Sequence, residues 1–406
     1  MRSGWLLFGA IAGLGCVQSN GERLSEFILK SKDLMFHRDP RHDMQAGKFH
    51  RVPMPCMDMP QSTKNAPACP DVMATEPAPD CYVCGAEGRL LYSGLTDPYG
   101  SAPGEWTLKR CPNPDCGLVW LDPMPRKEEI WKAYRVYYTH SDYREDGNRK
   151  PDPLNFLLLK IHKPLFKLFE HAIGMRRVEK KWRGRADEMF LGEAPAGGRL
   201  LDVGCGKGDL LVRLRQRGWN AEGLEVDGAA VNAARKERGL KVHEGELGGH
   251  RFPDHSFDAI TMNHVIEHVH DPVALLGECL RVLKPGGELA LATPNIRCFG
   301  HKMFGRNWSH LQSPSHLHLF TKASLADCAS RAGFRSVRAF CAPGYAEGGA
   351  IRVSIERAEE AAGKQRREFS KWVEASYLKV TAYYLYFVKR EEEAGEEIFL
   401  TARREK

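Results

Sequence analysis

A glycine-rich segment, Leu200 to Gly208, constrains the fold of this 406-residue chain more than any other feature. Apolar residues and Asp202 lead into three glycines spaced two apart, and the residues from Asp209 onward are typical of a helix. Glycine lets a backbone turn sharply and approach a ligand closely, so the pattern predicts a buried strand, a ligand-binding turn and a helix. Glu225 ends the next apolar segment, where a carboxylate can accept hydrogen bonds from ribose hydroxyls. We therefore predict a nucleoside-binding domain.

The glycine spacing narrows the class of nucleoside ligand. A dinucleotide site uses Gly-x-Gly-x-x-Gly/Ala, whose third small residue lets a helix N-terminus reach a pyrophosphate. In this chain Gly204 and Gly206 are followed by Asp209 at the third position. A carboxylate at that place repels phosphate, so the sequence favours a positively charged ligand that has no phosphate.

The glycine segment resembles motif I of class I S-adenosylmethionine-dependent methyltransferases, and later segments resemble the same family in the same order. The resemblance covers about residues 195–345 and the C-terminal strand. It implies a Rossmann-like, doubly wound α/β fold with a mostly parallel seven-stranded sheet that ends in an antiparallel hairpin. The segments that carry it are LLDVGCGKG (200–208), FPDHSFDAITMNHVIEHV (252–269), LRVLKPGGELALATPN (280–295) and EEIFLTARR (396–404).

The resemblance also implies which residues bind S-adenosylmethionine. The glycine loop is expected around the amino-acid end of the cofactor, with Asp202 orienting the loop or the ammonium group. Glu225 is expected to hold the ribose, Glu246 to lie near the adenine and Asn263 to lie beneath the sulfonium. The expected cofactor-binding residues are Asp202, Gly204, Cys205, Gly206, Gly208, Glu225, Val226, Glu246 and Asn263.

Four residues are candidates for the chemistry of methyl transfer. The reaction is an in-line displacement in which the protein mainly aligns donor and acceptor, and a hydroxyl or carbon-acid acceptor also needs a general base. His264, Glu267 and His268 form a His-x-x-Glu-His motif directly after the expected fourth strand. His316 lies in SPSHLHLFT (313–321), which resembles a loop that many relatives place over the substrate pocket.

Other interpretations of these residues stay open. The His-x-x-Glu-His motif is also found in zinc proteases, but here it lies inside a methyltransferase pattern. Some quinone-pathway O-methyltransferases resemble this region with Glu-x-x-Glu-His and a divalent ion, whereas here His264 replaces the first glutamate. Glu267 and His268 could instead only cap and pack a helix, and His316 could only fix its loop through hydrogen bonds.

Four cysteines predict a small metal-binding module over residues 81–125. Two close cysteine pairs on turns, separated by a hairpin-length segment, are typical of a zinc ribbon. Four thiolates favour a closed, structural Zn²⁺ site, and the alternative is four unrelated thiols. The segment also resembles the N-terminal zinc module fused to many bacterial methyltransferases of sugar and polysaccharide pathways. The expected ligands are Cys81, Cys84, Cys111 and Cys116.

Composition divides the rest of the chain. Residues 1–80 are predicted to be a disordered tail. Its first residues resemble a short signal segment, and the alternative is that the start codon is misassigned. Residues 126–195 are predicted to form a helical cap, and residues 196–406 the methyltransferase domain with a helical insert at 350–392. Most of the twelve cysteines are scattered, which favours a reducing, cytoplasmic compartment.

The predicted helical cap contains a strong local excess of positive charge. Between residues 154 and 185 there are nine Lys or Arg and two Glu, an excess equal to the whole net charge of +7. These basic residues alternate with leucine and phenylalanine at helical spacing, so the segment could contact an anionic membrane surface or attract an acidic substrate. The other interpretation is a packed helical cap with solvated lysines.

The predicted activity is methyl transfer to oxygen or carbon of a small molecule, such as a nucleotide sugar, a glycan or a lipid-linked intermediate. The sequence lacks an Asn/Asp-Pro-Pro-aromatic element after the fourth strand, which argues against methylation of amino groups on DNA bases. An RNA methyltransferase is one alternative, because a zinc ribbon beside a basic segment also suits RNA. A non-catalytic, zinc- or cofactor-dependent interaction module is the other.

Overall fold

The computed structural model describes residues 73–98, 100, 102–134, 153–342, 347–364 and 366–405. These residues belong to one compact unit, 68–406. Most of the predicted N-terminal tail, including its signal-like segment, lies outside the described residues.

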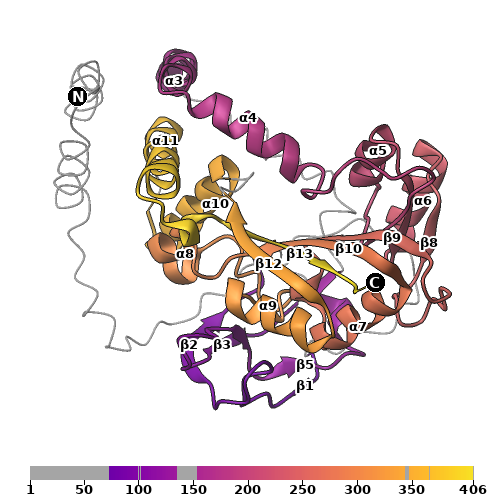
Figure 1. Cartoon of the computed structure of the whole chain (residues 1–406). Coiled ribbons are helices and arrows are strands. Elements are labelled where there is room, and N and C mark those ends of the chain that lie inside the picture. The colour runs from indigo at the N-terminus through magenta and orange to yellow at the C-terminus, as the bar shows by residue number, and fades with distance from the viewer. Residues whose placement is uncertain are drawn as a thin grey trace, which may run out of the picture. The chain divides into compact units, whose positions relative to one another are not determined.

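A seven-stranded sheet forms the centre of this unit, in the order β12-β13-β10-β9-β6-β7-β8 (Figure 1). Only β13 runs antiparallel to its neighbours, β10 and β12, and the other pairs are parallel. The predicted doubly wound sheet with an antiparallel end is therefore confirmed. The strands are β6 (Arg199–Val203), β7 (Asn220–Glu225), β8 (Val242–Glu244), β9 (Phe257–Asn263), β10 (Leu283–Pro294), β12 (Arg335–Ala342) and β13 (Glu397–Arg403).

Helices cover both faces of this sheet, as expected for parallel strands whose side chains are apolar on both faces. One apolar cluster joins the sheet to α5 and α6, and another joins it to α7 and α9. Local sequence defines where these helices begin: Asp227, Asp271 and Thr321 each accept a hydrogen bond from a backbone N–H of the first turn. The helices are α5 (Asp209–Gln216), α6 (Gly228–Arg238), α7 (Pro272–Val282) and α9 (Lys322–Arg331).

Two N-terminal strands, β1 and β5, pair with each other, and the other three share a sheet with a strand from much later in the chain. This four-stranded sheet has the order β11-β4-β3-β2, and its strand β11 (His318–Leu319) lies after β10 in the sequence. His318 pairs with Trp120 and Leu319 with Val119. The remaining elements of this region are β1 (Thr75–Glu76), β2 (Arg89–Leu95), β3 (Trp106–Arg110), β4 (Val119–Leu121), β5 (Met124–Pro125) and the 3₁₀ helix η2 (Ile130–Tyr134).

A further group of helices lies beside the end of the sheet that carries β12 (Figure 1). Helix α11 packs against both α10 and α3, and α3 is followed by α4. None of the helices that the structure describes is long and apolar enough to cross a membrane. The elements are α3 (Pro153–Ala172), α4 (Met175–Ala186), α8 (Phe299–Phe304), α10 (Glu347–Ala361), α11 (Glu368–Tyr383), a π-helical turn (Tyr384–Val388) and 3₁₀ turns at Ile266–His268, Gly305–Asn307 and Glu392–Ala394.

Candidate functional site

The glycine loop connects β6 to α5 at the carboxyl end of the sheet, where open α/β sheets bind ligands. Gly204, Gly206 and Gly208 have φ values of 72°, 52° and 84°, a region that side chains rarely adopt. A Cβ atom on Gly204 would lie 2.3 Å from Val265 Cγ2, so the loop also packs closely against the segment after β9. Cys205 is buried between these glycines, and burial raises the pKa of its thiol. The backbone of this loop is therefore the part that can face a ligand.

Glu225 fixes the loop from the end of β7. Its Oε2 accepts a hydrogen bond from Gly206 N at 2.8 Å, and its Oε1 accepts from Val226 N at 2.8 Å and Asp227 N at 3.0 Å. A carboxylate has about four acceptor sites and three are used here, so room remains for one hydroxyl donor. Val226 is 64% exposed beside it and offers an apolar surface next to these acceptors.

Asp202 lies near the end of β6, two residues before Gly204. It is buried on β6, where Oδ1 accepts a hydrogen bond from Thr261 Oγ1 on β9 at 2.7 Å. Burial raises the pKa of this carboxyl to about 7. Glu246 follows the end of β8 and is exposed, and it pairs with Lys127 of the N-terminal region at 3.1 Å.

Asn263 ends β9 and lines a pocket of about 200 Å³. The pocket has acidic groups from Asp187 and Glu397 and one guanidinium, from Arg213. Two acidic groups and one basic group suit a ligand that carries two positive charges and one negative charge. The remaining lining residues are Ala186, Met189, Leu210 and Phe399.

The four residues predicted to take part in methyl transfer lie close together, next to the end of β9. His264 has a φ of 55°, which is uncommon for a residue with a side chain and marks a constrained position. Its Nδ1 lies 3.0 Å from Glu267 Oε1, and its Nε2 lies 3.1 Å from Glu397 Oε1. Thr293 Oγ1 donates to the second oxygen of Glu267 at 2.9 Å.

Two of these side chains are charged and the other two are neutral. Burial opposes protonation of His264, but hydrogen bonds to Glu267 and Glu397 raise its pKa well above the usual value. Burial likewise opposes ionisation of Glu267, yet His264 lowers its pKa to about 2. His264 is therefore a held imidazolium and Glu267 a carboxylate, whereas burial lowers the pKa of both His268 and His316 and keeps them neutral.

Backbone carbonyls set the tautomers of the two neutral histidines. His268 Nδ1 lies 2.8 Å from Ser315 O, and His316 Nδ1 lies 2.8 Å from His310 O. A carbonyl only accepts, so both Nδ1 atoms carry the proton and both Nε2 atoms carry a lone pair. One potential ligand atom from each of Glu267, His268 and His316 lies within 4.8 Å of the others, so this group could also hold a divalent cation.

This ligand group differs from the one expected from the motif alone. Both ring nitrogens of His264 already contact carboxylates, and His316 from the loop before β11 takes the third place instead. His318, the other histidine of that loop, lies on β11 and contacts Val269 O through Nδ1 at 3.2 Å.

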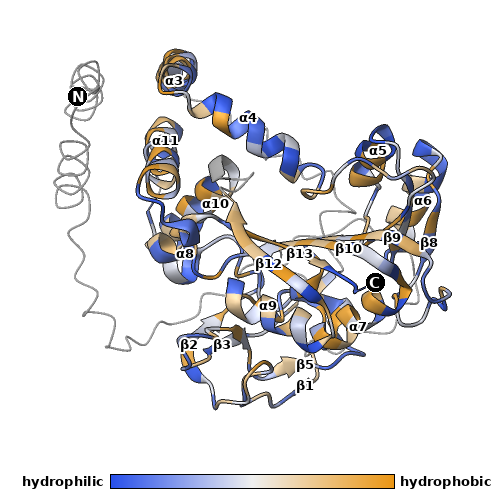
Figure 2. Cartoon of the chain, in the orientation of Figure 1, coloured by the Kyte–Doolittle hydropathy of each residue, from blue (hydrophilic) through white to orange (hydrophobic). Residues whose placement is uncertain are grey.

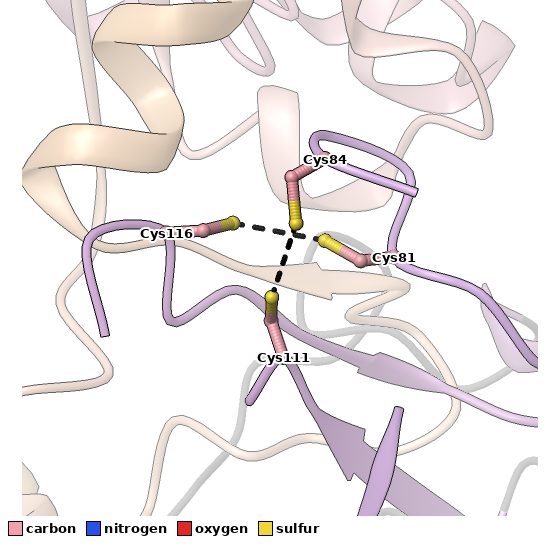
Figure 3. A group of neighbouring side chains, drawn as sticks. All are labelled: Cys81, Cys84, Cys111 and Cys116. Atoms are coloured by element: carbon pink, nitrogen blue, oxygen red, sulfur yellow. Dashed lines mark hydrogen bonds between the residues drawn. The ribbon is translucent and has the colours of Figure 1, made fainter. Parts of the chain in front are cut away.

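The four predicted zinc ligands converge on one point (Figure 3). Cys81 Sγ lies 3.6 Å from Cys116 Sγ, and Cys84 Sγ lies 3.3 Å from Cys111 Sγ. Tetrahedral Zn²⁺ with Zn–S bonds of about 2.3 Å separates its sulfurs by about 3.8 Å, so the four thiols fit such an ion with small shifts. Gly85 and Gly117 follow the pairs with φ values of 71° and 63°, which gives each turn its left-handed residue.

Comparison with known proteins identifies the family. A family model described as a methyltransferase domain matches residues 175–339. The "Probable S-adenosylmethionine-dependent methyltransferase" of Mycolicibacterium smegmatis is 31% identical over 204 residues, which are 47% of this chain and 76% of that protein. The chain belongs to the S-adenosylmethionine-dependent methyltransferases. The predicted enzyme class and the predicted cofactor, S-adenosylmethionine, are thereby confirmed.

Other relatives of this methyltransferase match over shorter stretches. The ubiquinone biosynthesis O-methyltransferase of Pseudomonas aeruginosa is 35% identical over 106 residues, 25% of this chain and 46% of that protein. The demethylmenaquinone methyltransferase of Thermus thermophilus is 38% identical over 121 residues, 28% of this chain and 54% of that protein. The methyltransferase thus spans about half the length of these two relatives.

The sequence did not indicate several groups at this site, among them Glu397 and His310. Glu397 contacts His264 from the start of β13, 133 residues away in sequence. His310 supplies the carbonyl that sets the His316 tautomer. The only sequence signal for Glu397 was that two acids, Glu396 and Glu397, stand together where the last strand begins. Nothing in the local sequence indicates which histidine a distant carboxylate will contact.

Replacing Glu225 by alanine should weaken binding of S-adenosylmethionine by roughly 100-fold. One hydroxyl-to-carboxylate hydrogen bond contributes about 1.5–3 kcal/mol, and the glycine loop also loses its acceptor. Calorimetric titration of the cofactor into the full-length methyltransferase measures this. Glu237→Ala on the exposed face of α6 is the matched control and should bind normally. Unchanged affinity in Glu225→Ala would place the ribose elsewhere.

Proposed function

We propose that this methyltransferase transfers the methyl group of S-adenosylmethionine to a hydroxyl oxygen of a small molecule, with a lipid-linked intermediate as the favoured acceptor. The observation that carries the proposal is the neutral His316 beside the Glu267–His264–Glu397 chain of hydrogen bonds. A hydroxyl must lose its proton to become a good nucleophile, and this group offers a buried proton acceptor with a compensating carboxylate. One relative is named as an O-methyltransferase of ubiquinone biosynthesis, which agrees with an oxygen acceptor.

The roles of the residues follow from their charges. When bound, S-adenosylmethionine supplies an electrophilic methyl group on a positively charged sulfur. His316 would accept the hydroxyl proton at Nε2 as the acceptor oxygen bonds to the methyl carbon, and the electron pair of the broken carbon–sulfur bond would leave with the sulfur as a neutral thioether. Glu267 stabilises the imidazolium that forms at His316. His264 acts as a positioning residue, because its fixed positive charge keeps Glu267 ionised.

The pocket beside Asn263 is proposed to receive the amino-acid end of the cofactor. It adjoins Leu210 in the first turn of α5, directly after the glycine loop. Asp187 and Glu397 would face the ammonium and sulfonium groups, and Arg213 would face the carboxylate. Asp202 contributes by tying β6 to β9.

The four cysteines are proposed to hold a structural Zn²⁺. They form a closed set of four thiols, which leaves no position for a reacting molecule. The ion would tie the turn before β2 to the turn between β3 and β4, and β4 pairs with β11 shortly after His316. The zinc site would therefore contribute to the placement of His316 without taking part in the reaction.

An acceptor assay tests the oxygen assignment. Purified enzyme and S-adenosylmethionine labelled in the methyl group are incubated with hydroxylated aromatic and sugar compounds, free and linked to a prenyl chain. Matched compounds have an amine or a methyl ether in place of the hydroxyl. We expect label in hydroxyl compounds alone, with the methyl carbon bonded to oxygen by NMR. Label in the amine series, in the ring carbon of the methyl ethers or in added RNA would contradict the proposal.

A further inference from the structure

Helix α3 exposes an apolar stripe. Leu157, Ile161, Leu165 and Leu168 follow each other at intervals of four, four and three residues, so they lie on one face of the helix. Their exposed fractions lie between 49% and 65%. Contiguous exposed apolar residues of this kind are rare on soluble proteins and mark contact surfaces. Phe156, 49% exposed, lies on the neighbouring face, where Lys160 Nζ is 4.4 Å from the centre of its ring.

A different face of α3 packs against α11, and it combines buried polar side chains with half-buried apolar ones. His162 Nε2 lies 3.1 Å from Ser376 Oγ, and Lys379 Nζ donates to Glu170 at 2.8 Å. The His162 ring also contacts Phe369. These three partners belong to α11. Since α3 is held in place through this face, its exposed apolar stripe is not needed for packing within the described part of the chain.

Basic side chains lie next to the stripe on α3 and continue along α4. Lys160, Lys163 and Lys167 are exposed on α3, and α4 carries six more basic residues, all of them exposed. The only acids in the two helices, Glu170 and Glu179, both pair with Lys379 of α11. Figure 2 shows hydrophobic and hydrophilic residues side by side along α3, whereas α4 is mostly hydrophilic. The surface thus combines an apolar stripe with a large excess of positive charge.

We infer that α3 and α4 bind an anionic lipid surface, with the apolar stripe inserted among the acyl chains and the basic residues facing the headgroups. Apolar side chains flanked by lysines are the pattern of helices that lie in a membrane interface, because long basic side chains can reach the headgroups from the edge of the apolar face. Neither helix is apolar enough to cross the bilayer. This inference does not depend on the acceptor proposed above.

Vesicle flotation of the full-length protein tests the inference. Vesicles of phosphatidylcholine with phosphatidylglycerol are compared with vesicles of phosphatidylcholine alone, at low and high salt. We expect binding to the anionic vesicles that weakens with salt. The double variant Leu157→Asp/Leu165→Asp should lose binding by about tenfold or more, because charge at both positions prevents insertion.

A matched variant and two further measurements make the result decisive. Leu90→Asp makes the same exchange at a residue that is 66% exposed on β2, and it should float with the vesicles like the original protein. Binding of S-adenosylmethionine and methyl transfer to a water-soluble acceptor should be equal in all variants, so failure here is distinct from failure of the proposed reaction. Absence of flotation, or equal flotation of the double variant, overturns the inference. Self-association that the double variant abolishes also overturns it, because a second copy then covers the stripe.

Discussion

Replacing His316 by asparagine should lower kcat by about 10²- to 10⁴-fold, the usual contribution of a general base. Asparagine can place its side-chain amide near the position of Nδ1, so the hydrogen bond to His310 O is retained while the Nε2 lone pair is lost. The affinity for S-adenosylmethionine should stay within about twofold, because His316 lies outside the glycine loop and the pocket. Steady-state kinetics and calorimetry together measure both quantities.

The asparagine variant distinguishes the role of His316 as a proton acceptor from its role in fixing the loop, which an alanine variant cannot do. His316→Ala removes both the lone pair and the loop-fixing hydrogen bond, so it should be at least as slow as His316→Asn. If His316→Asn keeps full activity and His316→Ala loses it, the histidine only fixes its loop and the proposed proton transfer is wrong. Metal analysis adds a further control, since a second bound metal equivalent that is lost in His316→Asn would assign the Glu267–His268–His316 group to a cation instead.

Removing the zinc site should unfold the N-terminal module and abolish activity with it. Structural Zn²⁺ in small domains contributes about 10–16 kcal/mol, as much as the whole free energy of unfolding of a typical domain. In Cys81→Ala the remaining thiols can no longer close the site. Because β4 pairs with β11, loss of the module also releases the loop that carries His316. Zinc content, thermal unfolding and limited proteolysis around residues 81–125 measure these effects.

Cys279→Ala is the matched control, because Cys279 is a fully buried cysteine of α7 that lies away from the four thiols. It should keep one zinc per chain and lose only the small stability of a trimmed buried side chain, about 1 kcal/mol. A Cys81→Ala protein with an intact module and unchanged activity would show that the thiols are not metal ligands.

The parts of the site that the sequence predicts are those fixed by local chemistry. Gly204, Gly206 and Gly208 occupy a conformation that excludes side chains, so their identity is a direct signal of the loop. The cysteine pairs are similarly local, since each pair lies on one turn. The resemblance of four segments to one family predicts the doubly wound sheet, and strands with apolar residues on both faces then need helices on both sides.

The remaining features depend on contacts between distant residues. The pairing of His264 with Glu397 and that of His318 with Trp120 each join segments that no periodicity connects. Helix α3 illustrates a second limit. Its spacing places Leu157, Ile161 and Leu165 on one face, yet this apolar face stays exposed, because contacts with α11 decide which face of the helix is covered.

The sheet shared by β4 and β11 has a consequence for how the protein is made. Thr321 donates to the carbonyl of Cys116, 205 residues earlier in the chain. At the usual rate of translation, about 5–20 residues per second, roughly 10 to 40 seconds separate the emergence of these two segments from the ribosome. During that time the thiols and the unpaired edge of β4 face the chaperones and redox buffers of the cell. The region synthesised first is completed only after most of the catalytic domain exists.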